Sequence, residues 1–412
     1  MIRTDFEQKT KSIIDEALTE IDKDEDGQSK IAFLNERLNA NLGIELDCQL
    51  ELRFGKPSIS EIIFPSPHLF ANDGYMSEIW QKGHGLQRLT MFSFLRTYND
   101  FKSKIDSESR NIIVAIEEPE IYLHPPIERA TYRLLRDLSE GDDQIIYSTH
   151  DSHFVAVKNF DEIRLFRKIA GRKPKTLIYE FSLDQLISYY KTCYGIDVDA
   201  LSLRHRFGYI CDQTKNEGFF AKKVILIEGE TEKYALPIYF SHLGFDVDNE
   251  RISLISAGSV DNITYLYVIF NEFNIPCYII FDGDKPDQNL EDLTDKKRKD
   301  ALNKTKRNKE LLKFVGEDVD EEAEYFFPST IVNEKYAVWE KNFEETFHKI
   351  IDNYSEIKGR AKELYGTDSK PLTGRFFANF LTNECPDKIS PYINELIKKI
   401  KKCEWTNSCL GY

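Results

Sequence analysis

Two stretches decide the fold: KVILIEGETEKYALP at residues 223–237 and CYIIFDGD at residues 277–284. Each begins with an apolar run typical of a strand that is buried on both faces, and each run ends in acidic residues. Between them the pattern predicts helices at 231–243 and 261–273 and a strand at 252–256. This alternation predicts a parallel sheet with right-handed crossovers, and therefore an α/β fold.

The acids that follow the first and third strands are candidate metal ligands. They are the acids of EGETE at 228–232, which begins with Glu228, and of DGD at 282–284, which are Asp282 and Asp284. In open parallel sheets, ligands bind beyond the carboxyl ends of the strands. Phosphodiester chemistry needs a hard cation, and Mg²⁺ takes oxygen ligands of this kind. Each motif alone also has a structural explanation, because Asp-Gly is a common turn and Thr231 can cap a helix. Both motifs in one βαβαβ unit favour a site.

A second set of motifs lies upstream of these strands. A glycine-rich turn opens an apolar helix, and two apolar strand patterns then end in EEPE and STH. The turn contains Gly83, Gly85 and Gln87. Glu117 and Glu118 follow the first of the two strand patterns, and His150 follows the second. Alone, the pieces are explained equally well as a loop, a charged turn and a strand end. The occurrence of all three pieces in this order and at this spacing is unlikely to be due to chance.

The downstream motifs FFAKKVILIEGETEKYALP, SAGS and CYIIFDGD resemble the TOPRIM (topoisomerase–primase) domain. More narrowly, they resemble that of the OLD (overcoming lysogenisation defect) nucleases, which include the nuclease subunit of Gabija-type defence. The resemblance implies that the strand-end acids hold one or two Mg²⁺ or Mn²⁺ ions, and that a lysine near the end of the domain assists phosphate chemistry. The residues assigned to these roles are Glu228, Glu232, Asp282, Asp284 and Glu324 (or Glu322) for the metal, and Lys370 for the phosphate.

The upstream motifs resemble the C-terminal half of an ABC-type ATPase head, with a signature loop, a Walker B strand, a D-loop and a switch histidine. The resemblance implies that Glu117 holds Mg²⁺ through water and that Glu118 polarises the attacking water. No G-x-x-x-x-G-K-[ST] occurs in the chain. We therefore expect ATP binding only if another chain supplies the missing lobe. A truncated relative, a split gene and a late start site remain open as explanations.

The chain has 412 residues, and 55 Lys and Arg against 70 Asp and Glu give a net charge of −15. This acidic balance does not exclude DNA, because local basic patches govern phosphate contact. The candidate nucleic-acid-binding residues are Lys296, Lys297, Arg298, Lys299 and Arg375. A solvated helix face explains the basic run 296–309 equally well.

Targeting signals are missing from the sequence. No apolar run reaches the roughly 18 residues of a membrane span, and the charged N-terminus has no signal-peptide core. Seven scattered cysteines include no CxxC pair. We expect a cytoplasmic protein with reduced thiols and no membrane partner.

The expected organisation is a partial ABC-ATPase-like lobe followed by a TOPRIM domain, a Rossmann-like parallel sheet with helical additions. The expected segments are a helical segment at 1–40 (ordinary packing or a dimer contact), the ATPase-like lobe at 41–182, a helical linker at 183–221, the TOPRIM domain at 222–385 with a charged insertion at 291–324, and a helical tail at 386–412.

We expect a divalent-metal-dependent DNA endonuclease of OLD type, nicking or cleaving DNA in antiphage or mobile-element defence as a homodimer or higher homo-oligomer. Two alternatives stay open. One is a regulatory or assembly subunit that docks on a separate, intact ATPase. The other is a TOPRIM hydrolase that acts on RNA.

Overall fold

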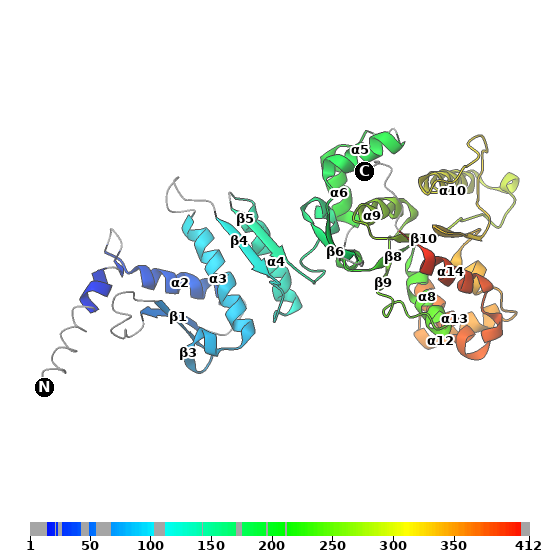
Figure 1. The fold of residues 1–412 in the computed structure, drawn as a ribbon. Coiled ribbons are helices and arrows are strands. Elements are labelled where there is room, and N and C mark those ends of the chain that lie inside the picture. The colour runs from blue at the N-terminus through cyan, green and yellow to red at the C-terminus, as the bar shows by residue number, and fades with distance from the viewer. Residues whose placement is uncertain are drawn as a thin grey trace. The chain divides into compact units, whose positions relative to one another are not determined.

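The computed structural model divides the chain into two compact units, Met1–Phe154 and Val155–Tyr412 (Figure 1). The residues it describes are 15–20, 22–23, 27–42, 49–54, 67–102, 112–141, 143–169, 175–194, 197–210 and 212–404. Parts of the expected 1–40 helix and of the 386–412 tail lie outside them. The described residues include no helix that is long and apolar enough to cross a membrane.

The first unit holds an antiparallel sheet and a parallel strand pair. The antiparallel sheet has the order β1 (Gln49–Phe54), β2 (Pro67–Asn72), β3 (Met76–Glu78). Two helices lie beside it, α2 (Lys30–Leu42) and α3 (His84–Lys102). The parallel pair consists of β4 (Ile113–Glu117) and β5 (Gln144–Ser148), connected by α4 (Pro125–Ser139).

The second unit is built on a five-stranded sheet of order β11-β12-β10-β8-β9. The strands are β8 (Lys223–Ile227), β9 (Ile252–Ser256), β10 (Cys277–Asp282), β11 (Ile331–Val332) and β12 (Tyr336–Trp339). Only β11 pairs in the antiparallel sense within this sheet. The crossover helices are α8 (Glu230–His242) and α9 (Val260–Glu272). The predicted α/β fold with a parallel sheet is confirmed.

Successive residues of the central strands point into two different cores. Val224 and Leu226 of β8 pack on the side of α9, whereas Ile225 and Ile227 pack on the side of α8. Figure 1 shows α9 on one face of the sheet and α8, α13 and α14 on the other. Because both faces are buried, these strands consist of uninterrupted apolar residues.

The other elements surround this sheet or extend it. They are the hairpin β6 (Leu165–Ile169) and β7 (Lys175–Tyr179), and the helices α5 (Leu183–Tyr194), α6 (Ala200–Ile210), α7 (Gln213–Asn216), α10 (Asp295–Phe314), α11 (Phe343–Phe347), α12 (Tyr354–Tyr365), α13 (Lys370–Glu384) and α14 (Pro391–Lys402). Short 3₁₀ turns occur at Ile79–Gln81, Val157–Glu162, Glu217–Phe219, Leu290–Asp292 and Pro386–Lys388.

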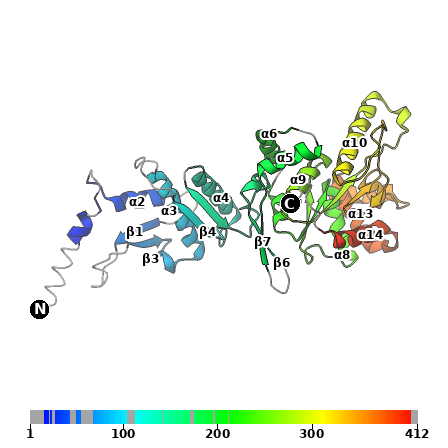
Figure 2. The same cartoon turned by 45° about the horizontal axis from the view of Figure 1, so that its top comes forward.

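The predicted charged insertion at 291–324 contains α10, the long yellow helix of Figure 2. Leu311 and Leu312 anchor the end of this helix in the core, while residues 295–300 at its start are exposed. The insertion is therefore a helix docked by its second half. The predicted domain limits stay predictions.

Candidate functional site

The carboxyl ends of β8, β10 and β12 lie at one edge of the sheet, because these strands are parallel neighbours. Glu228 follows β8, and Asp282 is the last residue of β10. The backbone N–H of Asp282 donates to Oε2 of Glu228 at 3.1 Å. The charges of Glu232, in the first turn of α8, and of Asp284 both act on Asp282, and the charge of Asp284 also acts on Glu228. The structure thus brings together the four acids that the sequence singled out.

The Asp282-Gly283-Asp284 turn is held tightly against the end of β12. The N–H of Gly283 donates to the carbonyl of Trp339 at 2.7 Å, and that of Asp284 donates to the carbonyl of Lys341 at 2.7 Å. A Cβ on Gly283 would lie 2.8 Å from the carbonyl oxygen of Glu340, so only glycine fits. Asp284 adopts a left-handed backbone conformation, with φ of 58°. These contacts fix the backbone positions of Asp282 and Asp284 at the end of β10.

Burial is the largest cause of a raised pKa at all four acids. It raises the pKa of Glu228 to about 7 and that of Glu232 to about 7. Burial raises the pKa of Asp282 well above its usual range, and the charges of the other three acids add to this effect. The pKa of Asp284 is also raised by burial, against the opposing effect of Lys304, whose Nζ lies 3.6 Å from Oδ1.

These pKa shifts predict that the metal-free protein loses stability as the pH rises from 4.5 to about 7. Folded Glu228 and Glu232 keep their protons up to about pH 7, whereas the unfolded chain releases them near 4.5. The folded state therefore binds more protons in this window, and the loss is on the order of 1–3 kcal/mol for each acid. Denaturant unfolding in EDTA at pH 5 and pH 8 measures it.

The control is the double variant Glu228→Gln, Glu232→Gln. Its free energy of unfolding should differ less between the two pH values, because neither amide titrates. If the wild type and the double variant respond to pH in the same way, these two acids do not have the pKa values that their burial implies.

A divalent cation fits this set of donors. All four side chains offer carboxylate oxygens, which Mg²⁺ and Mn²⁺ prefer. Oδ1 of Asp282 is buried and accepts no hydrogen bond from any described residue, an arrangement that costs free energy unless a cation or proton completes it. A cation would also relieve the mutual repulsion of the acids. The chemistry of the site therefore suits such an ion.

Glu344 is an acid of this site that the sequence analysis missed. It lies in α11, which begins just after β12, and its charge helps to raise the pKa values of Glu232 and Asp282. The hydroxyl of Thr231 lies 3.5 Å from Oε1 of Glu344. A usable signal existed, because Asn342 caps an acidic helix start directly after the apolar run YAVW. Glu324, the predicted residue, is exposed between α10 and β11 and is not among the principal charges on the four acids.

Lys370 and Arg375 lie on α13, which packs against α8. The two helices meet at Gly374, where a Cβ would lie 2.6 Å from Cγ2 of Thr231. Lys370 is the first residue of α13, one turn before this contact, and both basic side chains are exposed. In the described part of the chain neither forms an ion pair with the four acids. Their assigned roles stay predictions.

Two cations in the middle of α10 act on the acids. Lys304 faces Asp284, and Arg307 pairs with Asp261 at 3.2 Å and lowers the pKa of Glu228 against the effect of burial. Lys309 is buried and donates to two backbone carbonyls of the following loop. The predicted DNA-binding residues at 296–299 are exposed on the first half of the helix. The basic run therefore has three parts: an exposed start, a middle that acts on the acids, and the buried Lys309 near its end.

In the first unit, the glycine-rich turn forms the start of α3. Gly83 directly precedes the helix, and the side-chain amide of Gln87 donates to the carbonyl of Lys82 at 2.8 Å. A Cβ on Gly85 would lie 3.2 Å from the carbonyl oxygen of Tyr122. The turn therefore lies against the segment that follows β4.

The ends of β4 and β5 bring together three of the predicted nucleotide-site residues. Glu117 is opposite Ser148 in the parallel register, and the N–H of Glu118 donates to the carbonyl of Ser148 at 2.9 Å. Nε2 of His150 lies 3.2 Å from Oε1 of Glu118. Oε1 of Glu120 accepts the backbone N–H of His150 at 2.8 Å. These contacts hold the histidine beside the two glutamates.

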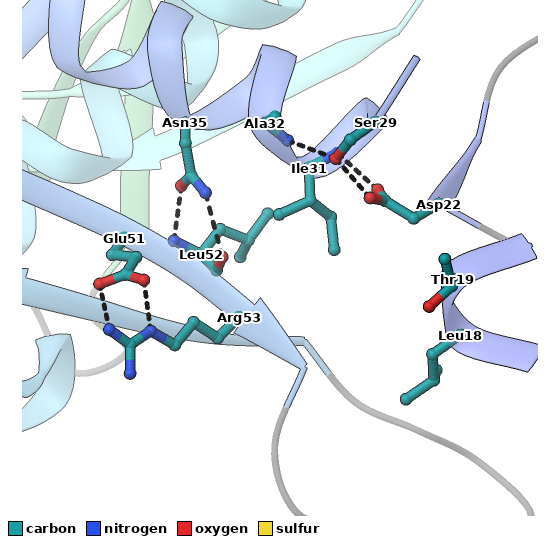
Figure 3. A pocket seen from close by; sticks show the side chains of 10 residues that line it. All are labelled: Leu18, Thr19, Asp22, Ser29, Ile31, Ala32, Asn35, Glu51, Leu52 and Arg53. Carbon is teal, nitrogen blue, oxygen red and sulfur yellow. Dashed lines mark hydrogen bonds and ion pairs between the residues drawn. The ribbon is translucent and has the colours of Figure 1, made fainter. Parts of the chain in front are cut away.

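A pocket of about 420 Å³ lies between α2, the turn before it and β1 (Figure 3). Its lining residues are Leu18, Thr19, Asp22, Ser29, Ile31, Ala32, Asn35, Glu51, Leu52 and Arg53. Their polar groups bond to one another. Asn35 bonds both backbone groups of Leu52, and Glu51 pairs with Arg53 at 2.5 Å. We assign this pocket a structural role, because its polar side chains already have partners.

Residues 219–284 match the protein family described as "Overcoming lysogenization defect protein-like, TOPRIM domain". Residues 2–155 match the family described as "AAA ATPase domain". The two matches are consecutive along the chain, and the first contains Glu228, Glu232, Asp282 and Asp284.

Three curated relatives are similar over larger parts of the chain. The OLD nuclease of Thermus scotoductus is 30% identical over 55% of this chain and 40% of its own length. The Old nuclease of Escherichia phage P2 is 26% identical over 58% of this chain and 40% of its own length. The endonuclease GajA of Bacillus cereus is 23% identical over 76% of this chain and 46% of its own length. This chain therefore spans less than half the length of each.

Proposed function

We propose that the chain is a divalent-metal-dependent DNA endonuclease of OLD type, because residues 219–284 match the OLD-like TOPRIM family. Its proposed setting is antiphage or mobile-element defence, in keeping with the nuclease names of its relatives. The observation that carries the proposal is the convergence of four mutually repelling carboxylates at the carboxyl edge of the parallel sheet, where Glu232 is buried and the other three are partly buried. Acids whose pKa values are raised by burial and by neighbouring negative charges cluster at functional sites.

The proposed ligands of Mg²⁺ or Mn²⁺ are Glu228, Asp282 and Asp284, with Glu232 as a further candidate. When bound, the ion supplies charge neutralisation and a more acidic water. Glu228 is oriented by the N–H of Asp282, and Asp284 by its bond to the Lys341 carbonyl. Because these hydrogen bonds fix the two residues, their carboxylate oxygens stay directed toward one metal position.

The basic side chains beside the acids suit a phosphate substrate. Lys304 and Arg307 face the acid cluster from α10, and Lys370 begins a helix that packs on α8. Cations in these places attract a phosphodiester toward the carboxylates and stabilise negative charge that develops on it. DNA is therefore the proposed substrate, and an RNA phosphodiester offers the same chemistry.

The direct test is incubation of the purified chain with supercoiled plasmid in Mg²⁺, Mn²⁺ or EDTA. The proposal expects conversion to nicked or linear DNA with a metal and none in EDTA. A matched RNA substrate cut faster than DNA would favour the RNA alternative. An absence of cutting with either metal on either substrate would sink the nuclease proposal for this chain acting alone.

Lys304→Gln should reduce metal-dependent nicking by roughly 10–100-fold, because it removes the cation closest to Asp284. The matched control is Lys306→Gln, which removes an equal charge from an exposed position two residues away. Nicking of the control should stay within about twofold of the wild type. Equal losses in both variants would assign Lys304 to general DNA attraction only.

One observation favours the second candidate, a subunit that docks on a separate ATPase. Ile113 and Ile146 on the β4–β5 pair are 67% and 59% exposed, although the opposite face of the pair packs on α4. Such an apolar face suits further ATPase structure supplied by another chain. Co-purification of the full chain with a Walker A protein, lost on Ile146→Glu but not on Ile178→Glu, would support this role; Ile178 lies in β7 and is similarly exposed, at 56%.

A further inference from the structure

We propose that Glu128, Asp151 and His153 form a second metal site in the first unit, with the chemistry of a zinc-type transition-metal dication. Glu128 lies in the first turn of α4, and the other two residues lie in the segment that follows β5. Each offers one ligand atom, and these atoms all lie within 4.8 Å of one another. The site is separate in sequence and in fold from the acids at the edge of the large sheet.

One imidazole nitrogen is the centre of this cluster. Nδ1 of His153 lies 2.8 Å from Oδ1 of Asp151 and 3.2 Å from Oε2 of Glu128. Nδ1 carries at most one hydrogen, and a single N–H cannot be well aligned with two carboxylate oxygens. The shorter contact, to Asp151, is the hydrogen bond.

Oε2 of Glu128 consequently has no hydrogen-bond donor among the described residues. Its residue is only 8% exposed, and its buried Oε2 accepts no hydrogen bond from any described residue although it points at the imidazole. A buried carboxylate oxygen in this condition is costly. A dication that replaces the shared proton would bond all three ligand atoms at once and remove the defect.

The donor set selects the type of ion. Imidazole nitrogen with two carboxylate oxygens suits Zn²⁺ and its first-row neighbours, whereas Mg²⁺ and Ca²⁺ prefer oxygen alone. Three protein ligands leave one tetrahedral position for water, and the side chain of Asp151 is 29% exposed. We therefore infer an accessible ion rather than one sealed in the core.

The position of the cluster also suggests what the ion does. Asp151 follows His150 directly, and its N–H donates to the hydroxyl of Thr149, which in turn donates to Glu120. A metal bound by Asp151, His153 and Glu128 would fasten this segment to the start of α4. It would thus fix the loop that holds His150 beside Glu118.

The test uses the full-length chain with Glu228→Gln and Asp282→Asn, so that the carboxylates of the proposed nuclease centre contribute little to metal binding. After metal removal, Co²⁺ is titrated and its visible absorption recorded, and Zn²⁺ is then added as competitor. We expect one equivalent of Co²⁺ with the absorption of a low-coordinate site, displaced by one equivalent of Zn²⁺. Zn²⁺ should also raise the thermal unfolding midpoint.

The decisive variants are His153→Ala and the nearly isosteric Glu128→Gln in the same background. Each should weaken Co²⁺ binding by at least about 100-fold, more than the loss of an outer partner costs. The matched control is His68→Ala, because His68 pairs with Glu78 at 2.7 Å and forms no ion pair with a second carboxylate among the described residues. Binding that survives both decisive variants, or its absence in the parent, would overturn the proposal.

Discussion

Glu228→Gln should abolish metal-dependent nicking and at the same time stabilise the metal-free protein. The amide cannot serve as an anionic ligand, and losing several kcal/mol of charge stabilisation corresponds to roughly 10²–10³-fold in rate. The amide oxygen can still accept the N–H of Asp282, so the turn is kept. The variant removes one charge from a set of buried acids that repel each other. The free energy of unfolding in EDTA at pH 8 should therefore rise by about 1–2 kcal/mol.

Opposite effects on activity and stability distinguish a ligand from a residue that holds the fold. A structural side chain in this position would lower both quantities when it is changed. The two measurements are plasmid nicking in Mn²⁺ and denaturant unfolding in EDTA, made on the same preparations.

Glu230→Gln is the matched control. Glu230 lies two residues away in the same loop-to-helix segment, but its side chain is exposed, and its one ion pair with a described residue is a long one, with Lys233 at 3.7 Å. The same chemical change there should leave nicking within about twofold and stability within about 0.5 kcal/mol. Equal behaviour of Glu228→Gln and Glu230→Gln would remove Glu228 from the metal centre.

The sequence was sufficient for the central sheet because its strands are buried on both faces. KVILI and CYIIF are almost entirely apolar, ISLIS is interrupted by two serines, and the helices between these strands have ordinary lengths. Parallel pairing then places the residues after each strand at one edge. The position of Glu228 beside Asp282 follows from these local patterns alone.

Glu344 and Lys304 needed information that local patterns do not contain. β12 has only four residues, and more than 50 residues separate it from β10 along the chain. Its place as the fourth parallel strand of the sheet therefore depends on a non-local pairing. On α10 nearly every turn carries a lysine or arginine. Only the docked orientation of the helix shows that Lys304 faces Asp284 while Lys296 and Lys299 face solvent.

Gly283→Ala should damage both the fold and the activity, because the structure leaves no room for a side chain there. The new Cβ would lie 2.8 Å from the carbonyl oxygen of Glu340 and 2.9 Å from that of Trp339. Both are backbone atoms at the end of β12, and they cannot rotate away as a flexible side chain would. Relief requires the turn to move off β12, which breaks the bonds from Gly283 and Asp284 to that segment. We expect a loss of about 1–3 kcal/mol in the free energy of unfolding.

The same displacement moves Asp282 and Asp284, which flank the glycine, away from their common target. A misplacement of about 1 Å at reacting groups costs on the order of 10²-fold in rate, so nicking should fall by about this factor even at a temperature where the variant is folded. Gly359→Ala is the control: it lies within α12, nothing approaches its Cβ within 4 Å, and alanine there should stabilise by about 0.5–1 kcal/mol. If Gly283→Ala nicks DNA and unfolds like the wild type, the close approach of β10 and β12 does not position the aspartates.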